Sequence, residues 1–110
     1  MRRLSEMDIV VLKKLAPEIE KKSKIEYRSI LPPVSMHYAV DEDDFEARLE
    51  RLTEEDLKYL ASKILDGSEC LLCITPEYAR IFIDFLASRL QGEQAGRIKE
   101  LYESSTGYKV

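Results

Sequence analysis

Apolar residues return every three or four positions along most of the chain, which is the spacing of one face of an α-helix. Five segments show it, and four follow a residue that caps helices: Ser5, Asp41, Thr53 or Thr75. The apolar positions of the five stripes are Met7, Ile9, Val10, Leu12 and Leu15; Phe45, Leu49 and Leu52; Leu57, Leu60, Ala61, Ile64 and Leu65; Tyr78, Ala79, Ile81, Phe82, Ile83, Phe85, Leu86 and Leu90; and Ala95, Ile98, Leu101 and Tyr102. The pattern predicts an all-α, or nearly all-α, bundle of about five helices.

Turn-forming residues indicate where these helices end. Pro17 ends or kinks the first one, because proline lacks the backbone N–H that an interior helical position needs. Gly67 suits a left-handed stop after the third helix. Thr75 and Pro76 form the clearest start, a capping hydroxyl followed by proline at the first helical position, and we expect that helix to continue to Gly92.

Two segments lack a clear period. Residues 18–30 approximate a helical stripe, yet Ile25 and Tyr27 also alternate as in a short strand. Residues 31–40 are apolar without period and contain Pro32 and Pro33, so we expect an irregular connector there. A residue before proline is disfavoured in the α region, which predicts extended geometry just ahead of Pro32.

Composition fits one compact domain spanning residues 1–110. The chain is 45% hydrophobic and 35% charged, with a formal net charge of −4. Its longest uncharged stretch, residues 29–40, contains two prolines and is too short to span a bilayer, so we expect a cytoplasmic protein with no membrane partner. Asn is absent and only two Gln occur, a composition typical of heat-adapted proteins.

Charge is divided unevenly along the chain. Residues 1–40 hold eight Lys or Arg against five Asp or Glu, a net charge of +3, and residues 41–110 hold nine against sixteen, a net charge of −7. The basic residues of the first part are Arg2, Arg3, Lys13, Lys14, Lys21, Lys22, Lys24 and Arg28. Because phosphate neutralisation needs a positive face, so small an excess favours solvated helix surfaces over nucleic-acid binding.

The acidic run 41–44 is better explained by helix capping than by a cation site. A calcium loop that began at Asp41 would need glycine at its sixth position, where the chain has Glu46. Acids in a first helical turn favour the positive end of the helix dipole. We expect Asp44 and Arg48 to form an ion pair on the solvent face of their helix.

Cys70 and Cys73 are separated by two leucines, a spacing that can hold a metal, cycle as a dithiol or simply lie in the core. A zinc site would need the distant His37 and a carboxylate such as Glu69 as further ligands. Since free cysteine is among the most buried residue types, we expect core thiols, with a metal site at Cys70, Cys73 and His37 as the alternative. A disulfide would close only a tiny loop and add little stability.

No set of catalytic residues is evident. His37 has Ser35 two positions away, but nothing else completes a catalytic set, and no glycine-rich phosphate motif occurs. The helix opened by Pro76 is nearly apolar all round, so it is either the central core helix or presents a second side to a partner.

We therefore expect no cofactor and a non-enzymatic, oligomeric interaction or regulatory module. The expected contact residues are Pro32, Pro33, Met36, Tyr38, Ile83 and Leu90. A metal- or thiol-dependent protein centred on the cysteines, and a nucleic-acid accessory protein, are the alternatives.

Overall fold

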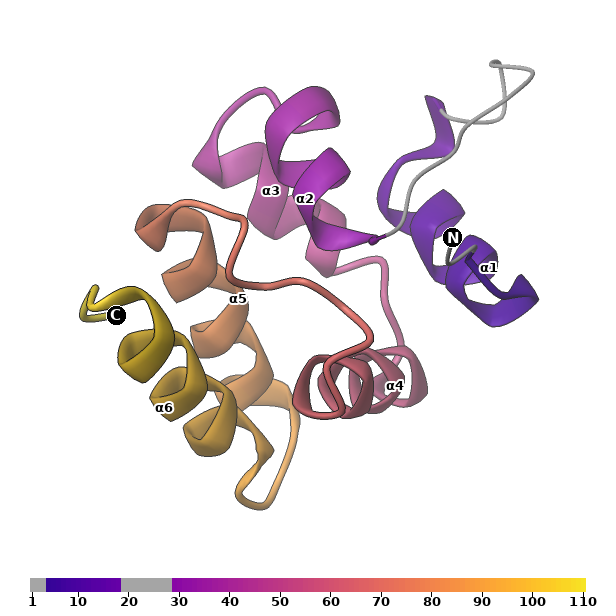
Figure 1. The fold of residues 1–110 in the computed structure, drawn as a ribbon. Helices are drawn as coiled ribbons and strands as arrows, with labels where there is room; N and C mark the ends of the chain where they lie inside the picture. The colour runs from indigo at the N-terminus through magenta and orange to yellow at the C-terminus, as the bar shows by residue number, and fades with distance from the viewer. Residues whose placement is uncertain (1–3, 19–28) are drawn as a thin grey trace.

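The helical periods of the sequence are realised in a computed structural model that describes residues 4–18 and 29–110 (Figure 1). The helical elements are α1 (Glu6–Leu15), α2 (Leu31–Pro33), the π-helical turn η2 (Val34–Tyr38), α3 (Glu42–Leu49), α4 (Glu54–Leu65), α5 (Pro76–Arg89) and α6 (Gln94–Thr106). The described residues contain no strand, so the predicted all-α class is confirmed. The ambiguity between helix and strand concerned residues that lie almost entirely outside the described ranges.

Two helices begin with reciprocal capping boxes. The Ser5 hydroxyl accepts from the backbone N–H of Asp8 at 3.2 Å, and the Asp8 carboxylate accepts from the N–H of Ser5 at 2.8 Å. Thr53 and Asp56 repeat this arrangement at the start of α4, with distances of 3.1 and 2.9 Å. Both starts were predicted from the capping residue, because it satisfies backbone donors that have no partner within the helix.

The other two predicted starts are also correct in position. Asp41 caps α3 by accepting from the N–H of Asp44 at 2.8 Å. α5 begins at Pro76 as expected, but the Thr75 side chain forms no capping hydrogen bond, so the predicted role of that hydroxyl is wrong. The fixed φ of proline, which suits the first helical position, is the local feature that supports this start.

The Pro-Pro connector is helical, which corrects the prediction of an irregular segment with Leu31 extended. Leu31, Pro32 and Pro33 form α2, and the chain continues as a π-turn in which Ala39 N–H donates to the Val34 carbonyl at 2.8 Å. Proline is tolerated there because backbone N–H groups in a first helical turn have no partner within the helix. The two prolines therefore sit at the beginning of the helical segment.

α5 is the central helix of the bundle, one of the two alternatives that the sequence left open. It packs against α3 on one side and α6 on the other, while α4 packs against α6 and α1 against α3 (Figure 1). Ala79, Phe82 and Leu86 are fully buried on it. Its apolar circumference is thus covered by two neighbours, and the described chain has a radius of gyration of 13.1 Å, about that of a compact domain of this size.

Arg48 joins three separate parts of the chain. Its Nε donates to Asp44 at 2.9 Å, and Nη1 donates to the Leu15 carbonyl at 3.0 Å. Nη1 and Nη2 hold the Glu18 carboxylate at 3.0 and 2.7 Å, and Nη2 also donates to the Tyr38 carbonyl at 3.0 Å. The Asp44 pair was predicted, but Arg48 is buried rather than on the solvent face. Its hydrogen bond holds the pKa of Glu18 at about 2.

Two buried carboxylates join α1 to α4 as well as capping those helices. Asp8 accepts from the Tyr59 hydroxyl at 2.7 Å and from Lys63 Nζ at 3.1 Å. Asp56 accepts from Lys14 Nζ at 2.7 Å. Each acid caps its own helix and pairs with a cation on the other, so the two helix starts and their contact stabilise each other. Hydrogen bonds to ionised groups are the stronger kind, which suits these acids to their buried positions.

Replacing Arg48 tests how far the fold depends on this residue. We expect Arg48→Ala to lower the free energy of unfolding by about 3 kcal/mol, because the Tyr38 carbonyl loses this donor and the Leu15 carbonyl keeps only the longer bond from Arg51, at 3.5 Å. Arg48→Lys should recover little, since one ammonium cannot reproduce a planar fork. Urea unfolding followed by circular dichroism measures both. Arg97→Ala, at an exposed position of α6, is the control and should change stability by less than about 0.5 kcal/mol; an equal loss in the control would contradict the role given to Arg48.

Candidate functional site

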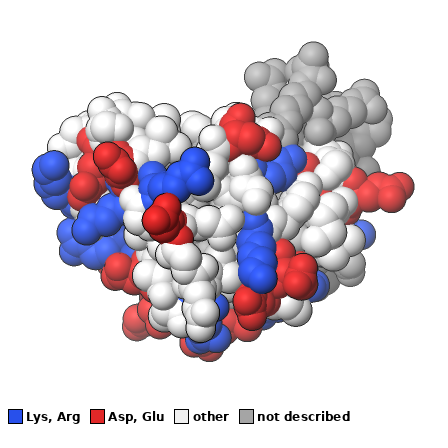
Figure 2. Space-filling view, turned by 90° about the horizontal axis from the view of Figure 1, so that it is seen from below, with Lys and Arg blue, Asp and Glu red and all other residues white. Residues whose placement is uncertain are grey.

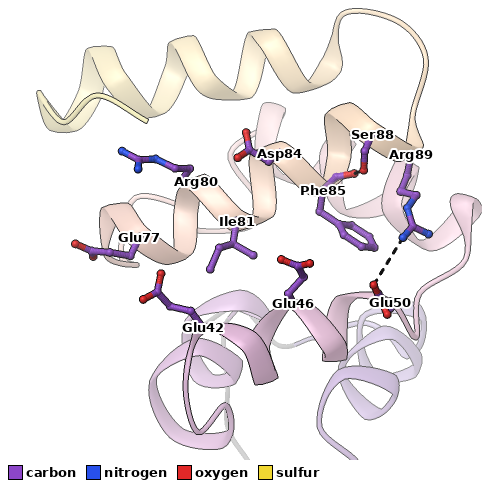
Figure 3. A pocket seen from close by; sticks show the side chains of 10 residues that line it. All are labelled: Glu42, Glu46, Glu50, Glu77, Arg80, Ile81, Asp84, Phe85, Ser88 and Arg89. Carbon is purple, nitrogen blue, oxygen red and sulfur yellow. Dashed lines mark hydrogen bonds and ion pairs between the residues drawn. The ribbon is translucent and has the colours of Figure 1, made fainter.

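A groove of about 340 Å³ runs between α3 and α5 (Figure 3). The residues that line it, called here the α3–α5 groove, are Glu42, Glu46, Glu50, Glu77, Arg80, Ile81, Asp84, Phe85, Ser88 and Arg89. Five carboxylates stand against two guanidinium groups, which gives the lining a net charge of −3. Its volume lies in the range of ligand pockets in proteins.

The α3 side of the groove is a row of glutamates. Glu42, Glu46 and Glu50 are spaced four residues apart, so they follow one face of the helix, and all three are exposed. Glu50 lies 3.9 Å from Arg89, whereas no cation among the described residues pairs with Glu42 or Glu46. Like charges four apart on a helix cost about 0.2–0.5 kcal/mol per pair, so this row disfavours α3 on its own.

The α5 side supplies an apolar base beneath these charges. Ile81 and Phe85 point from α5 towards α3, and Glu46 extends between them (Figure 3). The Arg89 guanidinium lies 4.6 Å from the centre of the Phe85 ring. In a second aromatic contact between the same two helices, Phe45 packs edge-on against Tyr78 with ring centres 5.0 Å apart. Phe85 is 7% exposed and belongs to the core, so the apolar surface that adjoins the unpaired negative charge is that of the half-buried Ile81.

The polar groups of the groove are suited to binding a charged ligand. The one hydroxyl in the lining, that of Ser88, donates to the Phe85 carbonyl at 2.9 Å and faces no base. Glutamates that are exposed and unpaired attract cationic groups, and an adjacent apolar base accepts the aliphatic part of a long basic side chain. The groove matches ligands that carry both features.

The predicted contact residues lie elsewhere. Ile83 and Leu90 are 5% and 7% exposed and belong to the core, so this fold offers neither side chain to a partner. Pro33 is buried in α2, while Pro32 and Tyr38 are half-buried. Met36 alone of the six is well exposed, at 64%. The groove was not predicted, although the spacing of its three α3 glutamates is visible in the sequence.

Cys70 and Cys73 form a disulfide in the connector between α4 and α5, which corrects the expectation of core thiols. Cys70 is half-buried and Cys73 is exposed, while the neighbouring Leu71 and Ile74 occupy the core instead. His37 is exposed on η2. No group of three or more His, Cys, Asp or Glu within residues 4–18 and 29–110 is placed to hold a metal ion. The metal site at these three residues remains a prediction without structural support.

Glu69, next to the disulfide, is a buried carboxylate at the start of α2. It is 4% exposed, and its carboxylate oxygens accept from the backbone N–H groups of Ile30 and Leu31 at 2.8 and 2.9 Å. The pKa of Glu69 is raised to about 7, because burial, with a smaller contribution from the nearby Asp8, outweighs the two backbone hydrogen bonds and Lys63, which lower it. The sequence indicated Glu69 only as a conceivable metal ligand.

Comparison of the chain with protein-family models, curated proteins and solved structures finds no match. None of the helices in the described part of the chain is both long and apolar enough to cross a membrane.

On the face shown in Figure 2, Lys and Arg side chains lie among Asp and Glu and do not form one continuous basic patch. Most of the basic N-terminal residues singled out in the sequence, Lys13 and Lys14 aside, lie outside the described ranges.

The raised pKa of Glu69 predicts how stability changes with pH. Between pH 4.5, the ordinary pKa of a glutamate, and about 7, the folded chain keeps this proton and the unfolded chain loses it. Stability therefore falls as pH rises through this window, by an amount on the order of 3 kcal/mol, and levels off above it. Glu69→Gln should flatten the fall, as urea unfolding at stepped pH would show. A wild-type curve parallel to that of the variant would contradict the assignment.

Proposed function

We propose that this protein is a helical protein-interaction module whose α3–α5 groove binds a positively charged segment of a partner protein. The observation that carries the proposal is the pair of unpaired, exposed carboxylates, Glu42 and Glu46, beside the half-buried side chain of Ile81.

Charge complementarity selects the partner chemistry. A lysine or arginine of the partner would place its charged end against the glutamates and its aliphatic stem on the half-buried Ile81. Binding would relieve the repulsion within the α3 row, so the ion pairs gain more in the complex than isolated surface pairs do. Phosphate-rich ligands are disfavoured because the lining carries a net charge of −3.

A synthetic helical peptide with lysine and leucine at alternating turns is the probe for this proposal. We expect it to bind in fluorescence anisotropy, to bind less tightly as salt increases, and to lose binding when its lysines are replaced by glutamate. Glu46→Lys in the protein should weaken binding about tenfold by opposing the charge in the groove.

The matched control is Glu100→Lys, which makes the same change in net charge at an exposed position of α6 outside the groove. It should change affinity less than about twofold. Equal losses in the two variants would mean that overall charge, and not the groove, drives binding. Failure of the wild-type protein to bind the lysine peptide at low salt would refute the proposal.

Self-association is a second candidate, favoured by apolar side chains on the outer face of α1. Met7, Ile9 and Val10 are 37%, 40% and 47% exposed there, which is unusual for neighbouring large apolar residues of a monomer. We expect light scattering at increasing concentration to show a dimer, and Val10→Glu to shift it towards monomer. A wild-type chain that stays monomeric throughout would eliminate this candidate without bearing on the groove.

A further inference from the structure

The connector that holds Cys70 and Cys73 is fixed by contacts that do not involve sulfur. Glu69 ties it to the start of α2, and the N–H of Cys70 donates to the Ser29 hydroxyl at 3.3 Å. On the other side of the pair, the Tyr102 hydroxyl donates to the Ile74 carbonyl at 2.9 Å. Leu71 and Ile74 are also buried in the core. The connector therefore has its own anchors before and after the disulfide.

The disulfide adds little to these anchors. It closes a loop of only four residues, and cross-links of short loops restrict the unfolded chain least. The Cα atoms of the two cysteines are 6.0 Å apart, within the usual range for a disulfide, so a dithiol on this backbone could close again without backbone movement. A bridge that closes a short loop, in a connector that other contacts also anchor, is suited to reversible opening.

The two sulfurs differ in access. Cys70 is half-buried, with its N–H bound to Ser29, whereas Cys73 is exposed next to Leu72, which is itself 43% exposed. Thiol–disulfide exchange requires the attacking sulfur to reach its target along the axis of the bond, so access decides which cysteine reacts with an external group. Cys73 is the cysteine that an external thiol or disulfide can approach.

We propose that Cys70 and Cys73 form a thiol–disulfide exchange site for low-molecular-weight or exposed protein disulfides, with Cys73 as the sulfur that reacts first. In the dithiol state, Cys73 loses its proton and its thiolate attacks a disulfide RSSR, which forms a mixed disulfide and releases RS⁻; this thiolate takes up the proton that Cys73 lost and leaves as RSH, and the second step balances in the same way with the proton of Cys70. The Cys70 thiolate then attacks the Cys73 sulfur and releases the second RSH. The two protein thiols are oxidised by two electrons, RSSR is reduced, and excess thiol reverses both steps.

Glutathione is the probe. The wild-type chain is equilibrated with reduced and oxidised glutathione at stepped ratios, quenched with acid and weighed by mass spectrometry. We expect a reversible change between disulfide and dithiol, with the helical circular dichroism retained in both states. In single variants, the cysteine left in Cys70→Ser should form a mixed disulfide with oxidised glutathione about ten times faster than the one left in Cys73→Ser.

Trapped mixed disulfide in the wild-type chain gives a measurement that does not depend on the variants folding. Peptide mapping by tandem mass spectrometry should place the glutathione adduct on Cys73. The proposal would be overturned by an adduct on Cys70 or by equal rates in the two variants. It would also be overturned if glutathione did not reduce the disulfide at any ratio while the protein is folded. Loss of helical signal on reduction would also overturn it, because the bridge would then be structural.

Discussion

The arrangement of the first half of the bundle depends on one buried guanidinium. Arg48 uses all of its donor groups, on the carbonyl that ends α1, on Glu18 just beyond it, on the carbonyl that ends η2, and on Asp44 of its own helix. The carbonyls of the last turn of a helix have no N–H donor within that helix. Where they are buried, a donor from elsewhere in the chain is needed. A planar, permanently charged fork meets that need at two helix ends at once, which neither lysine nor a neutral donor can do.

A negative group performs the opposite task at the start of α2. The carboxylate of Glu69 accepts from the first N–H groups of a segment whose next two residues are prolines and need no acceptor. Burial raises the pKa of this group to about 7, so its charge is the most easily neutralised of the buried acids. The four-residue turn with the disulfide follows Glu69 directly, and its backbone is fixed by the same contact that starts α2.

How much of this could be predicted from the sequence depends on the range of each interaction. Ser5, Asp41 and Thr53 act on backbone a few residues away, so the helix starts that they cap follow from local pattern. The sequence did not predict the helical connector, because the acceptor for its first backbone N–H groups is the carboxylate of Glu69, nearly forty residues later. Arg48 was placed in solvent for the same reason, since its spacing to Asp44 is local but its other partners are distant in sequence. The groove likewise needs two helices to meet before its charges share one surface.

The geometry of α3 explains how one short helix can both hold the bundle together and carry the proposed binding surface. Phe45 and Leu49 face the core, Arg48 faces α1 and η2, and the three glutamates follow the side next to α5. Eight residues leave about two turns, so each side is held by only two or three side chains. The repulsion along the glutamate row is tolerated because Arg48, Phe45 and Leu49 fix the helix independently of it. The glutamate charges are unfavourable to their own helix, but the fold holds that helix in place. A partner of opposite charge would stabilise such a surface.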